Sequence, residues 1–126
     1  MLITTLRIDN APLRSFTDGD LIIKEGQAGS KVYILYKGEL SVSQHGKHIT
    51  DLSDSGQVIG EIAHVLGKNY SATVTAKGDV SCFVIDNFQN FLRQNPEESW
   101  GIIRMLCERV ANTTDQLSGI KQEFSS

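Results

Sequence analysis

Residues 22–38 read IIKEGQAGSKVYILYKG, in which two short apolar segments are separated by glycine-bearing turns. The same kind of signal recurs at short, even intervals up to Lys77-Gly78. Short apolar strands separated by evenly spaced turns are typical of an antiparallel sandwich or barrel. The sequence therefore predicts a sheet-rich fold over residues 13–85. The turns of the quoted stretch lie at Glu25-Gly26, Ala28-Gly29 and Lys37-Gly38.

The predicted strands follow the apolar runs between these turns. Two of them, in residues 40–44 and 72–76, show the period-two alternation of a half-buried strand. Because helical patterns come only afterwards, the predicted fold class is mainly β with α: an antiparallel β-roll, or jelly roll, followed by a short helix and a long C-terminal helix. We place the strands at Leu21–Lys24, Val32–Tyr36, Leu40–Gln44, Lys47–Leu52, Tyr70–Ala76 and Val80–Ile85.

The character of the chain changes at Asp86. Aspartate is a good N-cap, and it precedes a short predicted helix over residues 87–94. Asn95-Pro96 then ends that helix and begins a longer one, which we expect to run from Glu97 to near Phe124. The sequence thus predicts a β-roll with short helices over residues 1–95 and a long helix over residues 96–126.

The long predicted helix carries apolar residues at spacings that alternate between three and four, with Thr113 as a polar interruption. Such a heptad pattern favours a partner helix, so we expect a homodimer. The alternative is that the same face packs on the β-roll of its own chain. The predicted dimer contacts are Ile103, Leu106, Val110, Leu117, Ile120 and Phe124.

Composition limits the possible functions. The 126 residues are enough for one ordinary domain, and a net charge of −3 offers no basic surface for nucleic acid, so we expect no nucleic-acid binding by this chain alone. We see neither a signal peptide nor a membrane-spanning run, and we expect a cytoplasmic protein. Cys82 and Cys107 are isolated, so we expect two buried, reduced thiols and no disulfide or metal site.

Three segments together carry a family resemblance. Residues 22–38 give a strand, a Glu-Gly turn and a strand; residues 60–76 give a Gly-Glu-Ile-Ala turn followed by an alternating strand; residues 102–124 give the long helix. Taken together they resemble the cyclic-nucleotide-binding domain family. The resemblance implies a regulatory domain that binds cyclic AMP, another cyclic nucleotide or a related small anion, with no cofactor.

The resemblance also implies a set of ligand contacts. Gly60 would let the backbone approach a cyclic phosphate, and Glu61 would accept a hydrogen bond from the ribose hydroxyl. The backbone N–H groups of Ile62 and Ala63 would bind phosphate oxygens at the start of a short helical turn. Ser71 would place its hydroxyl next to the phosphate.

Further residues bear on the implied ligand site, and one of them departs from the family pattern. Thr113 and Thr114 correspond to a pair that reaches the base from the long helix in bacterial activators. Tyr70 stands where the family places its phosphate-binding arginine, and a phenol donates one neutral hydrogen bond where a guanidinium donates two charged ones. Lys68 is an alternative cation. His64 is either a partly exposed loop residue or a ligand, including a haem ligand.

Three functions remain open from the sequence. The first is a ligand-sensing regulatory domain that signals through a dimer of its C-terminal helix. The second is a degenerate member of the family that no longer binds nucleotide and serves as a dimerisation module. The third is a metal-dependent, cupin-like enzyme, which would need clustered metal ligands; His45, His48 and His64 are too dispersed for that. We therefore predict a protein that is not an enzyme.

Overall fold

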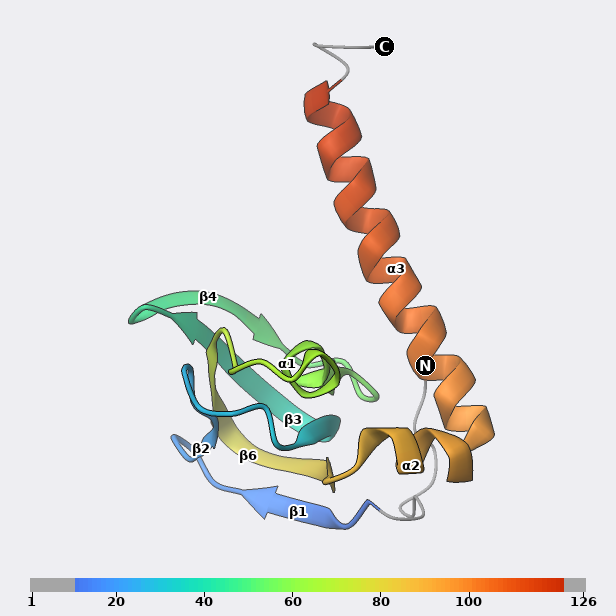
Figure 1. Cartoon of the computed structure of the whole chain (residues 1–126). Coiled ribbons are helices and arrows are strands. Elements are labelled where there is room, and N and C mark those ends of the chain that lie inside the picture. The colour runs from blue at the N-terminus through green and yellow to red at the C-terminus, as the bar shows by residue number, and fades with distance from the viewer. Residues whose placement is uncertain (1–10, 122–126) are drawn as a thin grey trace.

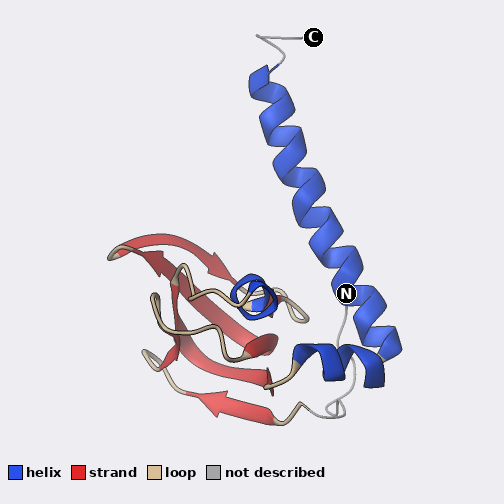
Figure 2. Cartoon of the chain, viewed as in Figure 1, coloured by secondary structure: helices blue, strands red, loops and turns tan. Residues whose placement is uncertain are grey.

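The computed structural model describes residues 11–121, and the side chains of residues 11–113. Figure 2 shows the strands curled together on one side of the molecule and the two longer helices on the other. The elements in chain order are β1 (Leu13–Phe16), β2 (Leu21–Ile23), β3 (Val32–Gln44), β4 (Lys47–Leu52), β5 (Val58–Ile59), α1 (Glu61–Leu66), β6 (Thr73–Ile85), α2 (Phe88–Gln94) and α3 (Pro96–Lys121).

The sheet is built around two long antiparallel strands, β3 and β6, which pair with each other. β1 and β2 pair with β6, and β4 and β5 pair with β3, all of them antiparallel. This arrangement confirms the predicted antiparallel β-roll followed by helices. The short strands at either side of the long pair curve inward and give the roll its interior (Figure 1).

Two pairs of predicted strands are in fact single strands. The sequence prediction ended one strand before Gly38 and another before Gly78, whereas β3 and β6 continue through both glycines. Gly38 has a φ of 107° and Gly78 a φ of 77°. The β3–β6 register also shifts on each side of Lys37. These glycines therefore permit bulges that bend a continuing strand, because a residue without Cβ tolerates positive φ.

β1 and β5 were not predicted. They contain four and two residues, which is too few for a periodic pattern to register. The predicted strand at Tyr70–Ala76 begins only at Thr73. The predicted helix cap was also wrong by one residue: Asn87 caps α2 by accepting a hydrogen bond from the Asn90 N–H, while Asp86 pairs with Lys31.

Two apolar cores hold these elements together. The first fills the interior of the roll and includes Leu35, Leu40 and Cys82, all fully buried. The second lies between the outside of the roll and the helices. There Phe91 of α2 and Ile102 of α3 pack with residues of β3 and β6. The second core fixes where α3 leaves the roll, and thereby which α3 residues reach the interior.

Beyond this anchor α3 extends away from the roll (Figure 1). Leu106 packs partly against the second core, while Ile103 and Val110 are 48% and 66% exposed. Leu117 and Ile120 belong to α3, but their side chains, like Phe124, lie outside the described part. Between residues 11 and 121, no helix is long and apolar enough to cross a membrane.

The expectation of two buried thiols is half wrong. Cys82 on β6 is fully buried, whereas Cys107 is exposed. The reason is the rotation of α3: the side that packs on the second core carries Ile102, Met105 and Leu106, and Cys107 points away from it.

Candidate functional site

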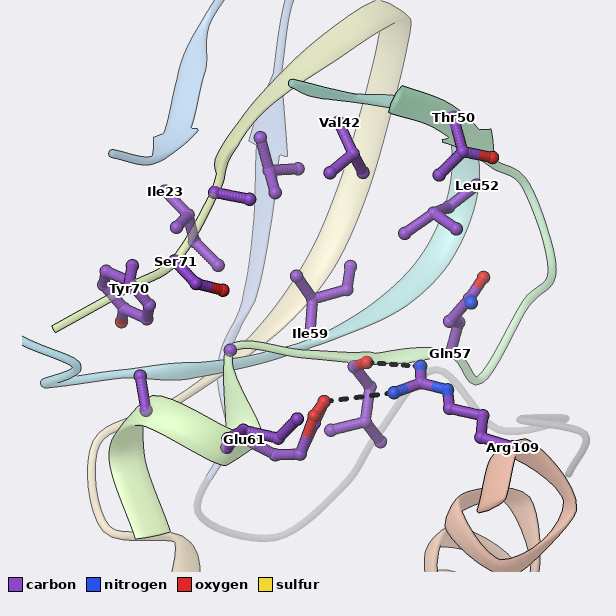
Figure 3. Close-up of a pocket in the computed structure, with 16 residues that line it drawn as sticks. Ile23, Val42, Thr50, Leu52, Gln57, Ile59, Glu61, Tyr70, Ser71 and Arg109 are labelled. Atoms are coloured by element: carbon purple, nitrogen blue, oxygen red, sulfur yellow. Dashed lines mark hydrogen bonds and ion pairs between the residues drawn. The ribbon is translucent and has the colours of Figure 1, made fainter. Parts of the chain in front are cut away.

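A cavity of about 350 Å³ opens inside the roll, between the sheet, the turn at Gly60 and α3. Figure 3 shows apolar side chains of the sheet on one side and the polar groups of Glu61 and Arg109 on the other. Its volume falls in the usual range of about 300–1,000 Å³ for small-ligand sites. The lining residues are Ile23, Val42, Thr50, Leu52, Gln57, Val58, Ile59, Gly60, Glu61, Ile62, Ala63, Tyr70, Ser71, Ala72, Val74 and Arg109.

Gly60 makes the turn that leads from β5 into α1. It has a left-handed backbone, with φ 83° and ψ 7°, and it offers no side-chain cap to the helix. A Cβ atom at this position would lie 3.0 Å from the Tyr70 ring, 3.1 Å from Ile23 and 3.2 Å from the Lys31 carbonyl oxygen. Both the backbone conformation and the surroundings therefore require glycine. The turn brings the start of α1 to the cavity wall.

Glu61, the first residue of α1, is only 6% exposed. Its carboxylate pairs with the Arg109 guanidinium, with 3.2 Å between Oε1 and Nη1. Burial raises the pKa of this carboxyl, while Arg109 and the backbone N–H groups of Glu61 and Ile62 oppose that rise. The net pKa is above the ordinary value because desolvation outweighs the opposing groups. A buried carboxylate with one charged partner thus lies at the cavity.

Arg109 was not predicted as a site residue. It reaches the cavity from α3, and its Nη2 also donates a hydrogen bond to the Val58 carbonyl at 2.8 Å. A signal was present in the sequence: Arg109 follows Ile102, Met105 and Leu106 at helical spacing, so it lies on the apolar face of its helix. A cation on an apolar face indicates a specific partner.

Tyr70 is 8% exposed and its ring forms part of the wall. Its hydroxyl donates to the Lys31 carbonyl at 2.6 Å and accepts from the Lys31 N–H at 3.0 Å. The single hydroxyl hydrogen is therefore used within the protein. In this arrangement Tyr70 shapes the cavity and does not donate into it.

The remaining predicted contacts divide into two groups. Ile62, Ala63 and Ser71 line the cavity together with Gly60, Glu61 and Tyr70. Thr113 does not: it is exposed, and its hydroxyl donates to the Arg109 carbonyl one turn earlier on α3. The side chain of Thr114 lies outside the described part of α3.

The two alternative residues lie away from the cavity. Lys68 is exposed just beyond the end of α1 and is not among the lining residues. His64 belongs to α1 and its ring contacts the start of α2: Nδ1 is 3.0 Å from the Gly29 carbonyl, and Nε2 accepts from the Phe88 N–H at 3.3 Å. Both ring nitrogens therefore have protein partners. Over the described residues, no group of three or more His, Cys, Asp or Glu could hold a metal ion.

Sequence comparison identifies the class to which this fold and cavity belong. Residues 13–95 match the family described as "Cyclic nucleotide-binding domain". The match covers the roll, the Gly60 turn and α2. The chain therefore belongs to the cyclic nucleotide-binding domain family, as the sequence motifs predicted.

Two individual relatives support this family assignment. The chain is 36% identical over 87 residues to a cGMP-dependent protein kinase of Drosophila melanogaster, covering 68% of this chain and 7% of the kinase. It is 34% identical over 114 residues to the potassium/sodium hyperpolarization-activated cyclic nucleotide-gated channel 4 of Oryctolagus cuniculus, covering 87% of this chain and 9% of the channel. The chain thus spans less than a tenth of these relatives.

The fold itself also occurs in a solved bacterial protein. The catabolite activator protein of Thermus thermophilus superposes with a TM-score of 0.73 over 90% of this chain and 56% of that one. The identity is 17%, so this likeness concerns the fold alone.

Proposed function

We propose that this chain is a ligand-sensing regulatory domain that binds a cyclic nucleotide or a related anionic ligand. The observation that carries the proposal is the cavity of about 350 Å³ with Glu61 buried at its edge and the Gly60 turn in its wall. An apolar pocket with a few convergent polar groups is the usual form of a small-molecule site.

Each group has a role in this proposal. The Glu61 carboxylate accepts a hydrogen bond from a ribose hydroxyl. The backbone at Ile62 and Ala63 would contact the phosphate, together with the Ser71 hydroxyl, because the first N–H groups of a helix have no backbone partner within the helix. The Ile62 N–H, which contacts the Glu61 carboxylate, would have to turn from Glu61 to the phosphate. The apolar side chains of the sheet, including Val42 and Leu52, contact the base. The Thr113-Thr114 pair remains a further proposed base contact, which would require α3 to lie closer to the cavity.

Signalling would pass through α3. Arg109 connects this helix to α1 through Glu61 and to β5 through the Val58 carbonyl. A ligand that alters either contact changes the preferred position of α3, which is the differential interaction that a conformational switch requires. We further propose that α3 pairs with the same helix of a second copy, that the domain is not an enzyme, and that it works in the cytoplasm without binding nucleic acid itself.

A thermal-shift screen tests the proposal. Cyclic AMP, cyclic GMP, 5′-nucleotides and inorganic phosphate are each added to the full chain. A ligand that binds the native state stabilises it by RT ln(1 + [L]/Kd), so a concentration about 100 times Kd adds about 2.7 kcal/mol. We expect a cyclic nucleotide to raise the melting temperature most. An unchanged melting temperature with every cyclic nucleotide at millimolar concentration would contradict the proposal.

The second candidate is a degenerate domain that only dimerises. It is favoured by Tyr70, whose hydroxyl is occupied by Lys31 and offers the cavity no charge. The thermal-shift screen distinguishes the two candidates, because no nucleotide should raise the melting temperature of a degenerate domain. Light scattering does not distinguish them, since both are proposed to be dimers.

A further inference from the structure

The cavity has one cationic side chain among the described residues that line it, and that residue is Arg109. Tyr70, at the position where the family resemblance places an arginine, uses its hydroxyl on Lys31. Lys68, the nearest lysine in sequence, is exposed beyond α1 and does not line the cavity. Among the described lining residues, an anion that enters therefore meets a cationic side chain from α3 and none from the Gly60 turn or the strand that follows it.

The Arg109 guanidinium has hydrogen-bond capacity to spare. It carries five N–H donors in a planar fork. One is directed to Glu61 Oε1 and one to the Val58 carbonyl. The Arg109 side chain is 37% exposed, whereas the Glu61 side chain that it pairs with is 8% exposed, so Arg109 is the more accessible member of the pair. Figure 3 shows it entering beside Glu61, at the edge of the cavity.

We propose that Arg109 is the anion-binding residue of this pocket, and that a bound ligand's phosphate forms charge-assisted hydrogen bonds to its guanidinium. This proposal rests on the proposed ligand-binding function, and it specifies which positively charged side chain of the site binds the phosphate. Arginine suits the role because its fork matches a phosphate bidentately.

The location of the cation has a consequence for signalling. An arginine on the strand after the Gly60 turn would be fixed to the roll, and its contact with a phosphate would leave α3 unaffected. Arg109 is carried by α3, so a phosphate bound to it connects ligand, roll and helix directly. The ligand would then stabilise the arrangement in which α3 lies against α1 and β5, and loss of ligand would weaken that arrangement.

A purely structural role for Arg109 makes a different prediction. If the guanidinium only neutralises Glu61, its removal lowers stability and changes the affinity for a phosphate-free ligand as much as for a phosphate-bearing one. A phosphate contact instead changes the affinity for the phosphate-bearing ligand alone. Comparison of cyclic AMP with adenosine therefore separates the two roles.

The experiment compares Arg109→Gln with the unmodified full chain by calorimetry for cyclic AMP and by NMR titration for adenosine. Because Arg109→Gln leaves a buried carboxylate unpaired and could unfold, Glu61→Gln and the double variant Glu61→Gln, Arg109→Gln form a second, neutral pair. We expect loss of Arg109 to weaken cyclic AMP binding about tenfold or more in either background. Adenosine binding should stay within about twofold, and Arg109→Lys should recover part of the loss.

Arg104→Gln is the matched control, since Arg104 lies on the same helix, pairs with Glu108 at the surface and does not line the cavity. Its cyclic AMP affinity should be unchanged. If the unmodified chain binds cyclic AMP and removal of Arg109 leaves that affinity unchanged, or reduces adenosine binding equally, the assignment of Arg109 is overturned while the proposed function stands. If the unmodified chain binds no cyclic nucleotide, the proposed function fails and the assignment with it.

Discussion

The Tyr70 hydroxyl satisfies both backbone polar groups of Lys31, donating to its carbonyl at 2.6 Å and accepting from its N–H at 3.0 Å. One side chain thereby fixes the start of β3 to the segment that follows α1, 39 positions away in sequence. A guanidinium could not replace it here, because arginine has five donors and no acceptor. The difference between Tyr70 and an arginine is therefore structural as well as electrostatic.

Replacement of Tyr70 by phenylalanine should destabilise the fold. The ring and its packing remain, but the Lys31 N–H and carbonyl lose their partner, which costs about 1–3 kcal/mol of unfolding free energy. Urea unfolding measures the change. Tyr36→Phe is the control, because the Tyr36 ring packs edge-on against Phe83 and phenylalanine preserves that contact. Equal effects of the two substitutions would contradict the role assigned to the Tyr70 hydroxyl.

Gly60→Ala should cost more stability than Gly19→Ala. Both residues have nearly the same positive φ, 83° at Gly60 and 85° at Gly19. A Cβ on Gly19 meets nothing within 4 Å, whereas one on Gly60 meets the Tyr70 ring at 3.0 Å. The strain of positive φ, of about 1–2 kcal/mol, is common to both, so the excess loss at Gly60 measures the crowding. Denaturant unfolding of the two variants provides the comparison, and similar losses would show that the cavity wall relaxes freely.

The effect of Glu61 on stability should depend on pH with a definite sign. Its folded-state pKa is raised, so at pH values between the unfolded and the folded pKa the native state binds more protons than the unfolded chain. The contribution of Glu61 to stability therefore falls as pH rises through this window, and its cost is fully present above the folded pKa. The free energy of unfolding of Glu61→Gln relative to the unmodified chain should rise from about pH 4.5 upward and then become constant.

Urea unfolding between about pH 4 and about pH 7.5 tests this behaviour. Glu39→Gln is the control, since Glu39 lies on the surface of β3 and pairs with the exposed Lys77. A difference between Glu61→Gln and the unmodified chain that falls with rising pH would show that Arg109, and not burial, dominates the pKa of Glu61.

Ile103→Asp combined with Val110→Asp should convert a dimer into a monomer. Both side chains are exposed on α3, where they form an apolar surface with Leu106, Cys107 and Ala111. A charge buried in a helix pair is costly, so the mass measured by light scattering should halve. Ile49→Asp is the control, because Ile49 is also exposed but lies on β4. A mass that is unchanged by the double substitution would exclude this face from any dimer.

The two thiols should differ in reactivity. Burial raises the pKa of Cys82 to about 12, while Cys107 is exposed on α3. Because the thiolate is the reactive form, one equivalent of a thiol reagent should react with the folded variant Ile103→Asp, Val110→Asp, in which no partner helix covers Cys107, and a second only after unfolding. Cys107→Ser added to the Ile103→Asp, Val110→Asp variant is the control. It should leave the folded protein unreactive toward the thiol reagent. Rapid reaction of two thiols in the folded state would contradict the burial of Cys82.

Local patterns were sufficient for the β-roll and for part of the site. Apolar alternation and turn glycines depend on neighbouring residues, so the strands around Leu40 and the turn at Gly60 could be read from the chain. The strand ends predicted at Gly38 and Gly78 were wrong because that prediction also used neighbouring residues alone. A glycine in a turn and a glycine in a bulge look alike locally, and only pairing of β3 with β6 distinguishes them.

The amino-acid sequence thus determined the longer strands of the roll, the helical turn after Gly60 and the two helices α2 and α3 that follow the roll, because these features follow from interactions between near neighbours. Tertiary structure decided that Arg109 reaches Glu61 across 48 positions and that the Tyr70 hydroxyl is used on Lys31. Such pairs depend on how α3 leaves the second core and on how the strands curve. Contacts between residues far apart in sequence set the direction of α3 and the curvature of the strands. Neither can therefore be predicted from a local sequence pattern.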